Sequence, residues 1–161
     1  MSKQGYMPPA KTVEWETPQA FFDRLDAEFE FTLDAAANHD NAKCEAYYDI
    51  EMDGLAKSWQ NHCVWCNPPY GGRVLAGWVR KAHAESKTCP HPIVMLLPAR
   101  TDVKWWHDCA MQADEVRFVK GRLKFTGGKH SATFPSVVVV FRSILTRRDG
   151  APRFSSMPAR L

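Results

Sequence analysis

The sequence contains no apolar run that approaches the roughly 18 residues required by a membrane-spanning helix. Its five cysteines are an odd number without the spacing of a disulfide framework, and its first residues do not resemble a signal peptide. Charge of one sign is not dominant either, because 21 basic residues nearly balance 18 acidic ones, and the net charge of +3 permits nucleic-acid binding without requiring it. We therefore expect a protein of the reducing cytoplasm that makes no membrane contact.

Cys63 and Cys66 are separated by two residues, the spacing of a zinc knuckle or a redox pair. The apolar residues around them predict a strand, in which positions three apart point to opposite faces of the sheet. The sequence contains no second close pair of cysteines, whereas a structural zinc ion takes four ligands. We expect buried structural cysteines and no metal site.

Apolar periodicity predicts one domain that alternates helices with strands. Helices are expected at residues 17–29, 74–86 and 104–113, and strands at residues 30–37, 62–66, 92–100, 115–125 and 136–142, with a further short strand near Tyr47. In the first helix, Thr17 is the expected N-cap and Pro18 lies in the first turn.

The two ends of the chain differ from the middle in composition. Residues 1–14 lack periodicity and contain two prolines, so we expect a flexible arm there. Residues 146–161 contain basic residues, proline and serine, which predicts a disordered tail. The expected domain is therefore residues 15–145.

The order of elements indicates an α/β fold. Alternating strands and helices, followed by two strands without a helix between them, predict a three-layer sandwich with a mostly parallel sheet and an antiparallel C-terminal hairpin. Asp34 and Asn67 each follow an early strand of this sheet. Because the carboxyl ends of parallel strands lie at one edge, where open α/β sheets hold ligands, we expect both side chains at that edge.

Asn67, Pro68, Pro69 and Tyr70 form a stiff loop after the strand that ends at residue 66. The Asn67 side-chain oxygen and the Pro68 carbonyl oxygen can accept the two hydrogens of a planar exocyclic amine, and proline rigidity keeps both acceptors in place. Accepting both hydrogens concentrates the nitrogen lone pair, while Tyr70 offers a ring on which a heterocycle stacks. The tetrapeptide fits methyl transfer from a sulfonium donor to such an amine. The alternative is a proline turn whose Tyr70 covers the core.

Asn67-Pro68-Pro69-Tyr70 resembles the catalytic motif of amino-group methyltransferases that use S-adenosylmethionine. Further stretches are similar to phage-type DNA N6-adenine methyltransferases (Dam-like) and span residues 15–141: WETPQAFFDRLDAEFEFTLDAAA, NAKC, DGLAKSW, CNPPYG, MLLPARTDVKWW, GRLKF and FPSVVVVF. The resemblance implies a Rossmann-like methyltransferase sandwich, S-adenosylmethionine as cofactor and double-stranded DNA as partner. It implies site-specific transfer to the amine of a flipped adenine by a monomer or homodimer, in the host-cell cytoplasm if the protein is phage-encoded.

The resemblance also implies a cofactor pocket. Thr17 and Pro18 match the family's element at the methionine part of the donor, although Thr17 as an N-cap is compatible with this. Asp34 would neutralise the donor's ammonium group or anchor the pocket's first loop, where the small residues Ala35 and Ala36 replace the usual glycines. Asp53 would accept from the ribose or the adenine amine of the cofactor, and Asp49 and Glu51 compete for this role.

For the DNA, the resemblance and the positions of basic residues in loops indicate five contacts: Arg73, Arg100, Lys124, Phe125 and Lys129. For Arg100 a salt bridge at the edge of the core is an equal alternative. Phe125 would stack on an extruded base or serve as hairpin core. Two rival functions remain open, namely methylation of another planar amine (RNA guanine N2 or a protein glutamine) and non-catalytic DNA binding.

Overall fold

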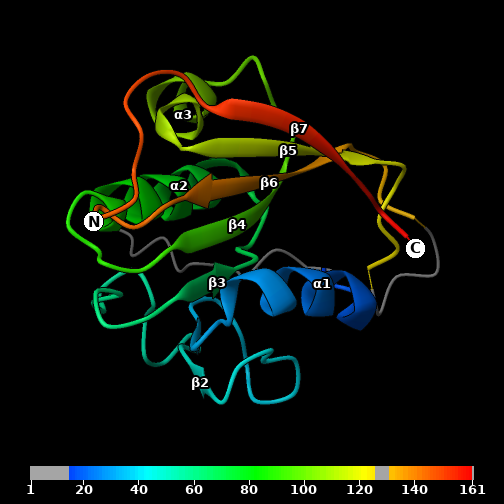
Figure 1. Cartoon of the computed structure of the whole chain (residues 1–161). Helices are drawn as coiled ribbons and strands as arrows, with labels where there is room; N and C mark the ends of the chain where they lie inside the picture. The colour runs from blue at the N-terminus through cyan, green and yellow to red at the C-terminus, as the bar shows by residue number, and fades with distance from the viewer. Residues whose placement is uncertain (1–14, 126–130, 161) are drawn as a thin grey trace, which may run out of the picture.

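The computed structural model describes residues 15–125 and 131–160, so the predicted arm at residues 1–14 and the predicted DNA contact Lys129 lie outside the described residues. The elements run in the order α1 (Gln19–Phe29), β1 (Leu33–Asp34), β2 (Ala46–Tyr47), β3 (Val64–Cys66), α2 (Gly72–Ser86), β4 (Ile93–Pro98), α3 (Lys104–Asp108), the 3-10 helix η1 (Ala110–Gln112), β5 (Glu115–Lys120), β6 (Ser136–Phe141) and β7 (Arg153–Pro158). They build one sheet with helices on both sides (Figure 1).

The seven strands follow the order β2-β1-β3-β4-β6-β5-β7 across the sheet. β6 is antiparallel to both of its neighbours, β4 and β5, whereas the remaining pairs are parallel. The pairing of β5 with β6 confirms the predicted C-terminal hairpin, and the α/β sandwich with a mostly parallel sheet is confirmed with it. β4 and β6 are buried along their whole length, as the continuous apolar runs of their sequences predict.

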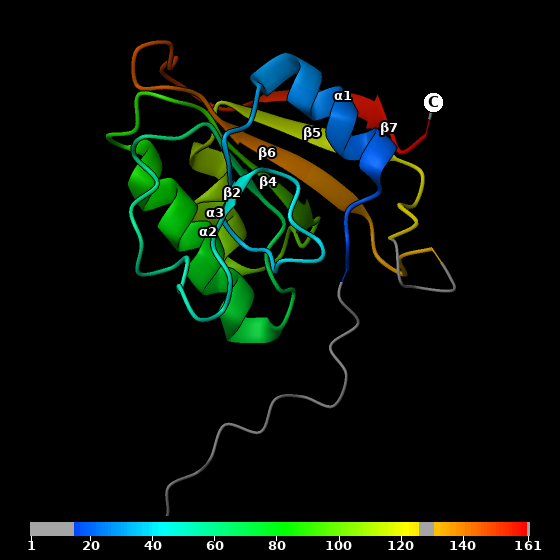
Figure 2. The same ribbon diagram turned by 90° about the horizontal axis from the view of Figure 1, so that it is seen from below.

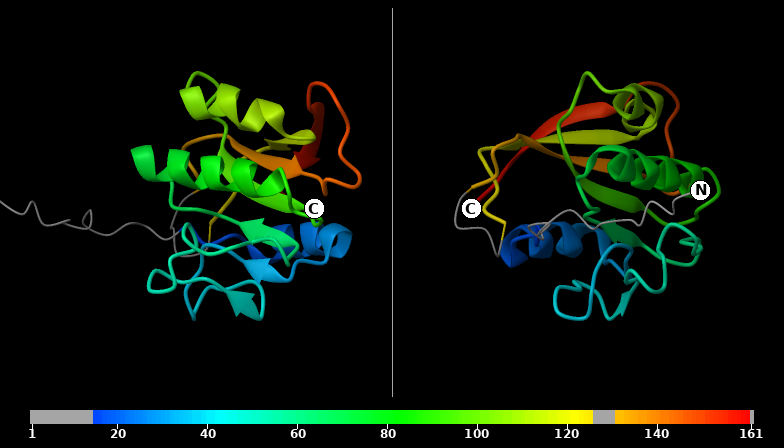
Figure 3. Two further views of the ribbon diagram at one scale, coloured as in Figure 1. Left: turned by 90° about the vertical axis from the view of Figure 1, so that its left-hand side faces the viewer. Right: turned by 180° about the vertical axis from the view of Figure 1, so that it is seen from behind.

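The helices form the two outer layers (Figures 2 and 3). α1 covers one face of the sheet, and α2 and α3 cover the other. On the first face the Phe22 ring meets the Trp65 ring of β3 at 5.5 Å between centroids. On the second face His83 of α2 stacks on Phe141 of β6 at 5.9 Å. No helix within the described parts of the chain is long and apolar enough to cross a membrane.

The first helix begins later than predicted. α1 starts at Gln19, and its N-cap is Pro18 in an extended conformation, without a side-chain capping bond. The prediction of Thr17 as N-cap is therefore wrong. The residue before a proline is disfavoured in the helical region, which keeps Thr17 outside the helix and frees its hydroxyl for another partner.

The prediction of a disordered tail is also wrong, because residues 153–158 form β7. β7 pairs in parallel with β5 from Glu115 to Lys120, and the Phe118 and Phe154 rings stack at 6.0 Å. The polar composition of this segment suits an edge strand, whose side chains are largely exposed. Backbone hydrogen bonds to the open edge of β5 order the segment, and a prediction from composition does not include them.

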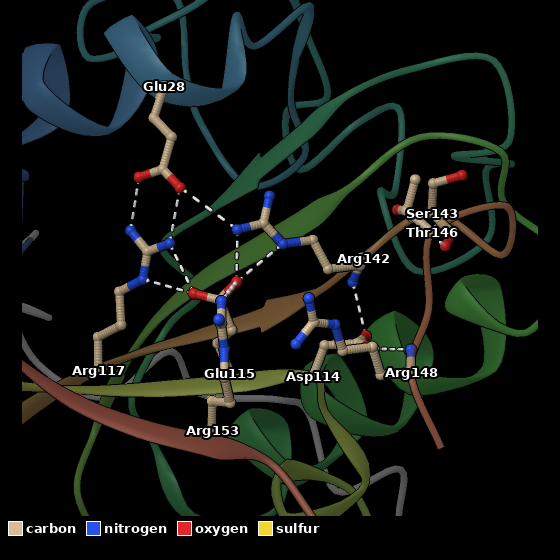
Figure 4. Close-up of polar contacts among 9 residues, drawn as sticks. All are labelled: Glu28, Asp114, Glu115, Arg117, Arg142, Ser143, Thr146, Arg148 and Arg153. Atoms are coloured by element: carbon tan, nitrogen blue, oxygen red, sulfur yellow. Dashed lines mark hydrogen bonds and ion pairs between the residues drawn. The ribbon is translucent and has the colours of Figure 1, made fainter. Parts of the chain in front are cut away.

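A cluster of charged residues ties α1 to the sheet at the edge where β5 begins (Figure 4). Buried Glu115 accepts hydrogen bonds from Arg117, at 2.7 Å, and from Arg142. Glu28 of α1 binds Arg117 with both carboxylate oxygens, at 2.6 and 2.7 Å. We call Glu28, Glu115, Arg117, Arg142 and Arg153 the ion cluster. The arginines lower the pKa values of both carboxyl groups, so the cluster is fully charged near neutral pH.

Candidate active site

The loop of residues 67–70 leaves the sheet at the carboxyl end of β3, as predicted. β1 and β3 are parallel neighbours, and Asp34 is in register with Trp65, two residues before Asn67. Asp34 and Asn67 therefore lie at the same edge of the sheet, opposite the ion cluster. At the end of the loop Gly72 adopts a φ of +32°, a conformation that favours glycine, and α2 begins there.

The Asn67 amide is held on three sides. Its nitrogen donates to the Trp15 carbonyl at 2.6 Å and to the Thr17 hydroxyl at 3.0 Å. Its oxygen lies 2.7 Å from the Tyr70 hydroxyl, which donates to it. A backbone carbonyl only accepts, so the group that faces Trp15 must be the amide nitrogen, and the oxygen is left as the acceptor.

Two acceptors at this loop retain capacity for a ligand. A carbonyl oxygen has two lone pairs, and the Tyr70 hydroxyl occupies only one of those on the Asn67 oxygen. Within residues 15–125 and 131–160, no group donates a hydrogen bond to the Pro68 carbonyl. Arg100 contacts the loop through its guanidinium, which lies 3.4 Å from the Tyr70 carbonyl. Arg100 forms no ion pair with any described residue, so the salt bridge considered as its alternative role is not present among them.

Tyr70 is 8% exposed and does not present an open face in this structure. Its hydroxyl also lies 2.9 Å from the Leu96 carbonyl of β4, and burial raises its pKa well above the usual value. The ring meets Phe134 edge-on at 5.5 Å and Phe125 at 6.3 Å, and Trp15 contacts both phenylalanines. We call Trp15, Tyr70, Phe125 and Phe134 the aromatic cluster. Phe125 is 1% exposed, which matches hairpin core, the alternative to its stacking role.

Asp34 is almost fully buried and organises the loop that follows β1. One carboxylate oxygen accepts from the Lys43 backbone N–H at 3.0 Å, and the other lies 3.4 Å from the Ala36 N–H. Burial raises the pKa of this carboxyl to about 6, against the effect of the two N–H groups and the Lys43 charge. The Lys43 ammonium in turn pairs with Glu16 at 3.2 Å. The carboxyl thus anchors the loop, one of the two roles considered for it.

The second predicted cofactor segment lies against the first. A side chain at Gly54 would place its Cβ 2.3 Å from the Ala35 carbonyl, so only glycine permits this approach. Asp53 precedes it with a φ of +53°, and one of its carboxylate oxygens accepts from the Leu55 N–H at 3.2 Å. Asp49 accepts from two backbone N–H groups, those of residues 51 and 52, and caps the same turn. Of the three competing acids, Asp53 is the one adjacent to the contact with Ala35.

The remaining predicted residues are distributed along the same edge. Arg73 is exposed in the first turn of α2, and Lys124 is exposed beside the buried Phe125.

Cys63 and Cys66 are buried, and burial raises both thiol pKa values, that of Cys63 to about 12, which keeps both thiols protonated.

Sequence reasoning missed Trp15 and Phe134, two members of the aromatic cluster. The contact between Trp15 and Asn67 joins residues 52 positions apart, and no local pattern announces it. An aromatic residue two positions before the Thr-Pro pair was the available signal.

The sheet order and the loop at its carboxyl edge define an α/β methyltransferase fold. Residues 5–152 match the family described as DNA N-6-adenine-methyltransferase (Dam). A DNA N-6-adenine-methyltransferase of Escherichia phage T1 is 33% identical over 111 residues, which cover 68% of this chain and 45% of the phage protein. One of Haemophilus phage HP1 is 30% identical over 107 residues, 65% of this chain and 61% of that protein. The chain belongs to the DNA N-6-adenine-methyltransferase family, and it spans about half the length of these curated relatives.

Proposed function

We propose that the protein transfers a methyl group from S-adenosylmethionine to the N6 amine of a flipped adenine in double-stranded DNA. The observation that carries the proposal is the pair of acceptors at the carboxyl edge of the sheet. The Asn67 oxygen is oriented by contacts on both ends of its amide, and the adjacent Pro68 carbonyl has no donor among the described residues. The names of the phage relatives and the family match support the same activity.

In this mechanism the two acceptors act on the nucleophile. The Asn67 and Pro68 oxygens accept the two N–H groups of the adenine amine, and the nitrogen becomes pyramidal with its lone pair directed away from them. The neutral amide network keeps the acceptors in place, so little reorganisation is needed in the transition state. When bound, S-adenosylmethionine supplies an electrophilic methyl group on a sulfonium. As the nitrogen lone pair forms the new N–C bond, the bond between the methyl group and sulfur would break, the sulfur would leave as a neutral thioether, and the surplus proton of the amine would pass to solvent water.

The cofactor is proposed to lie at the loop after β1. Asp34 provides a carboxylate, Ala35 and Ala36 allow close approach to the backbone, and Asp53 offers its second oxygen to a ribose or an amine. The close fit of Gly54 on Ala35 supports this assignment because it joins the two segments in one site. Pro18 lies at the same edge, and Thr17 reaches this site through Asn67.

The adenine has to leave the helix, because the amine of a paired and stacked base cannot reach acceptors at a strand end. The Tyr70 ring is covered by Phe125 and Phe134, so stacking on Tyr70 requires one of those rings to move. Arg73, Arg100, Lys124 and Lys129 are proposed to contact the DNA, and Phe125 to contact the base once the cluster has opened.

The test offers duplex DNA, tRNA and a release-factor-like protein in parallel, with tritium-labelled S-adenosylmethionine. We expect label in the DNA alone, and N6-methyladenine after digestion to nucleosides. Label in RNA or protein would favour one of the other planar amines. Donor binding without transfer to any of the three would overturn the proposal.

A further inference from the structure

A groove of about 170 Å³ lies between the first turn of α1 and the ends of β5 and β7. Three basic side chains from three separate segments line it: Arg24 of α1, Lys124 after β5, and Arg160 after β7. Its apolar wall includes Pro18 and Phe21, and none of the described residues that line it is acidic. Figure 2 shows the start of α1 beside the end of β7.

The cations of this groove differ from those of the ion cluster because no acid among the described residues forms an ion pair with them. Arg24 donates from one terminal nitrogen to the Pro158 carbonyl at 2.7 Å, while its buried Nε has no hydrogen-bond partner among the described residues. Lys124 and Arg160 make no hydrogen bond or ion pair within residues 15–125 and 131–160. Three uncompensated cations around one hollow are suited to an anion.

Two residues that line the groove are sequence neighbours of residues in the candidate active site. Pro18 lines the groove, and the preceding Thr17 accepts from the Asn67 amide. Lys124 lines the groove, and the following Phe125 packs in the aromatic cluster at Tyr70. An anion held in the groove would therefore lie next to two of the segments that carry the proposed site of the target base.

We infer that this groove binds a backbone phosphate of the DNA next to the flipped nucleotide, an inference that rests on the proposed function. Arginine presents planar N–H groups that match phosphate oxygens, and lysine adds a point charge. Phosphate contacts fix the register of a protein on the duplex and carry no sequence information of their own. The strand β7 gains a role from this, because it places Arg160 in the site.

The test compares two double variants that each remove one lysine and one arginine. Lys124→Ala with Arg160→Ala alters the groove. Lys87→Ala with Arg148→Ala alters exposed residues at the opposite edge of the sheet and is the matched control. DNA affinity is measured by fluorescence anisotropy of a labelled duplex over a series of salt concentrations, after circular dichroism has shown that both variants are folded.

We expect the groove variant to reduce the magnitude of the slope of log affinity against log salt by about 1, because one phosphate contact is lost, and the control to retain the wild-type slope. The loss should be equal for duplexes with and without adenine. Equal slopes for the two double variants would overturn the inference. The same preparations are assayed for adenine methylation: absence of transfer by the wild-type protein counts against the proposed function, whereas transfer with equal slopes counts against the groove alone.

Discussion

The two edges of the sheet use polar groups in opposite ways. At the edge where β5 begins, the ion cluster matches the carboxylates Glu28 and Glu115 with arginines (Figure 4). At the edge where β3 ends, the Asn67 amide is held by a hydroxyl on each end and by a backbone carbonyl, all of them neutral. At the second edge burial raises the pKa of the Asp34 carboxyl, whereas the pKa values of the carboxyl groups in the ion cluster are lowered.

This difference separates stability from function. Removal of one partner from a well-oriented ion pair lowers the stability of the fold, because the other buried charge is left unpaired. Their hydrogen-bonding capacity is used within the protein. A neutral network fixes the direction of an amide while it leaves one lone pair on the oxygen, and the cations nearby remain available to a ligand. The ion cluster therefore holds α1 and the strands together, and the opposite edge keeps the acceptors and cations to which the proposed function assigns the substrate.

The largest expected effect is on Asn67. Asn67→Ala removes an acceptor that strengthens its contact as the amine lone pair localises, so the single-turnover rate of methyl transfer should fall by about 10²- to 10³-fold. Asn67→Asp keeps an acceptor of similar shape and should retain part of the activity. Circular dichroism spectra should match that of the wild type, because the Asn67 side chain is only partly buried and is not a member of the apolar core.

A folded, donor-binding Asn67→Ala protein with a rate near that of the wild type would contradict the mechanism. Such a result would also mean that the Asn67 network at the edge where β3 ends does not serve methyl transfer.

The next effect concerns the ion cluster. Glu115→Ala leaves Arg117 and Arg142 with Glu28 as their shared acid and removes the acid that pairs with Arg153, so the free energy of unfolding should fall by about 3 kcal/mol. The methyl-transfer rate per folded molecule should stay within about twofold of the wild type, because no member of the cluster touches the proposed substrate site. Urea denaturation and single-turnover assays on the same samples measure both quantities, with Asp149→Ala, the loss of an exposed carboxylate, as a control of equal charge change. An altered rate at unchanged stability would show that the two edges are coupled.

Local sequence patterns predicted the fold to the extent that burial controls it. The apolar runs of β4 and β6 and the helical spacing of Leu75, Trp78 and Val79 gave the central strands and α2, because these signals act over neighbouring residues. β7 could not be predicted in this way. Its exposed side chains carry no apolar pattern, and its order comes from the backbone groups of a strand distant in sequence.

The candidate site divides along the same line. Asn67 and Asp34 were predictable because each follows a strand, and parallel strands bring such positions to one edge. The roles of single contacts were not. Thr17 as an N-cap is a local expectation, whereas its contact with Asn67 depends on how α1 is laid against β3. Arg24 and Arg160 belong to one groove only because β7 adds to the sheet.

The raised pKa of Asp34 gives the two edges opposite pH dependence. If the ionised carboxylate attracts the ammonium group of the donor, S-adenosylmethionine affinity should fall about tenfold between pH 7 and pH 5, as the group protonates through its pKa of about 6. Isothermal titration calorimetry at pH 5, 6 and 7 measures this loss. Asp34→Asn should bind more weakly at pH 7 and show a flat profile. A wild-type affinity that is constant over this range would leave Asp34 as an anchor of the loop alone.

Stability provides a second measurement of the same contrast. Because the folded pKa of Asp34 lies above the unfolded value of 3.8, the folded state takes up a proton between pH 6 and pH 4, and this group stabilises the fold as the pH falls. Glu115 behaves in the opposite sense: its pKa is lowered on folding, and its contribution, present above the unfolded value of 4.5, is lost as the pH falls through the folded pKa. As the pH is lowered, the free energy of unfolding should therefore change less for Glu115→Ala than for the wild type through the loss of this contribution.

The smallest effect is expected for Tyr70→Phe, which tests how far the neutral network can lose a member. The ring and its packing against Phe125 and Phe134 are kept, and the hydroxyl that lies between the Asn67 oxygen and the Leu96 carbonyl is removed. The hydrogen bond from the hydroxyl to the Asn67 oxygen is lost, so the free energy of unfolding should fall by about 1 kcal/mol. The rate should fall only a few-fold, since Trp15 and Thr17 still hold the amide nitrogen and the freed lone pair remains available to the substrate.

Tyr70→Ala, in which the ring is lost as well, serves as the contrasting variant and should approach the rate of Asn67→Ala. Single-turnover rates and urea denaturation of the two variants decide the point: a rate for Tyr70→Phe as low as that for Asn67→Ala would mean that the tyrosine hydroxyl, and not the amide clamp, aligns the acceptor.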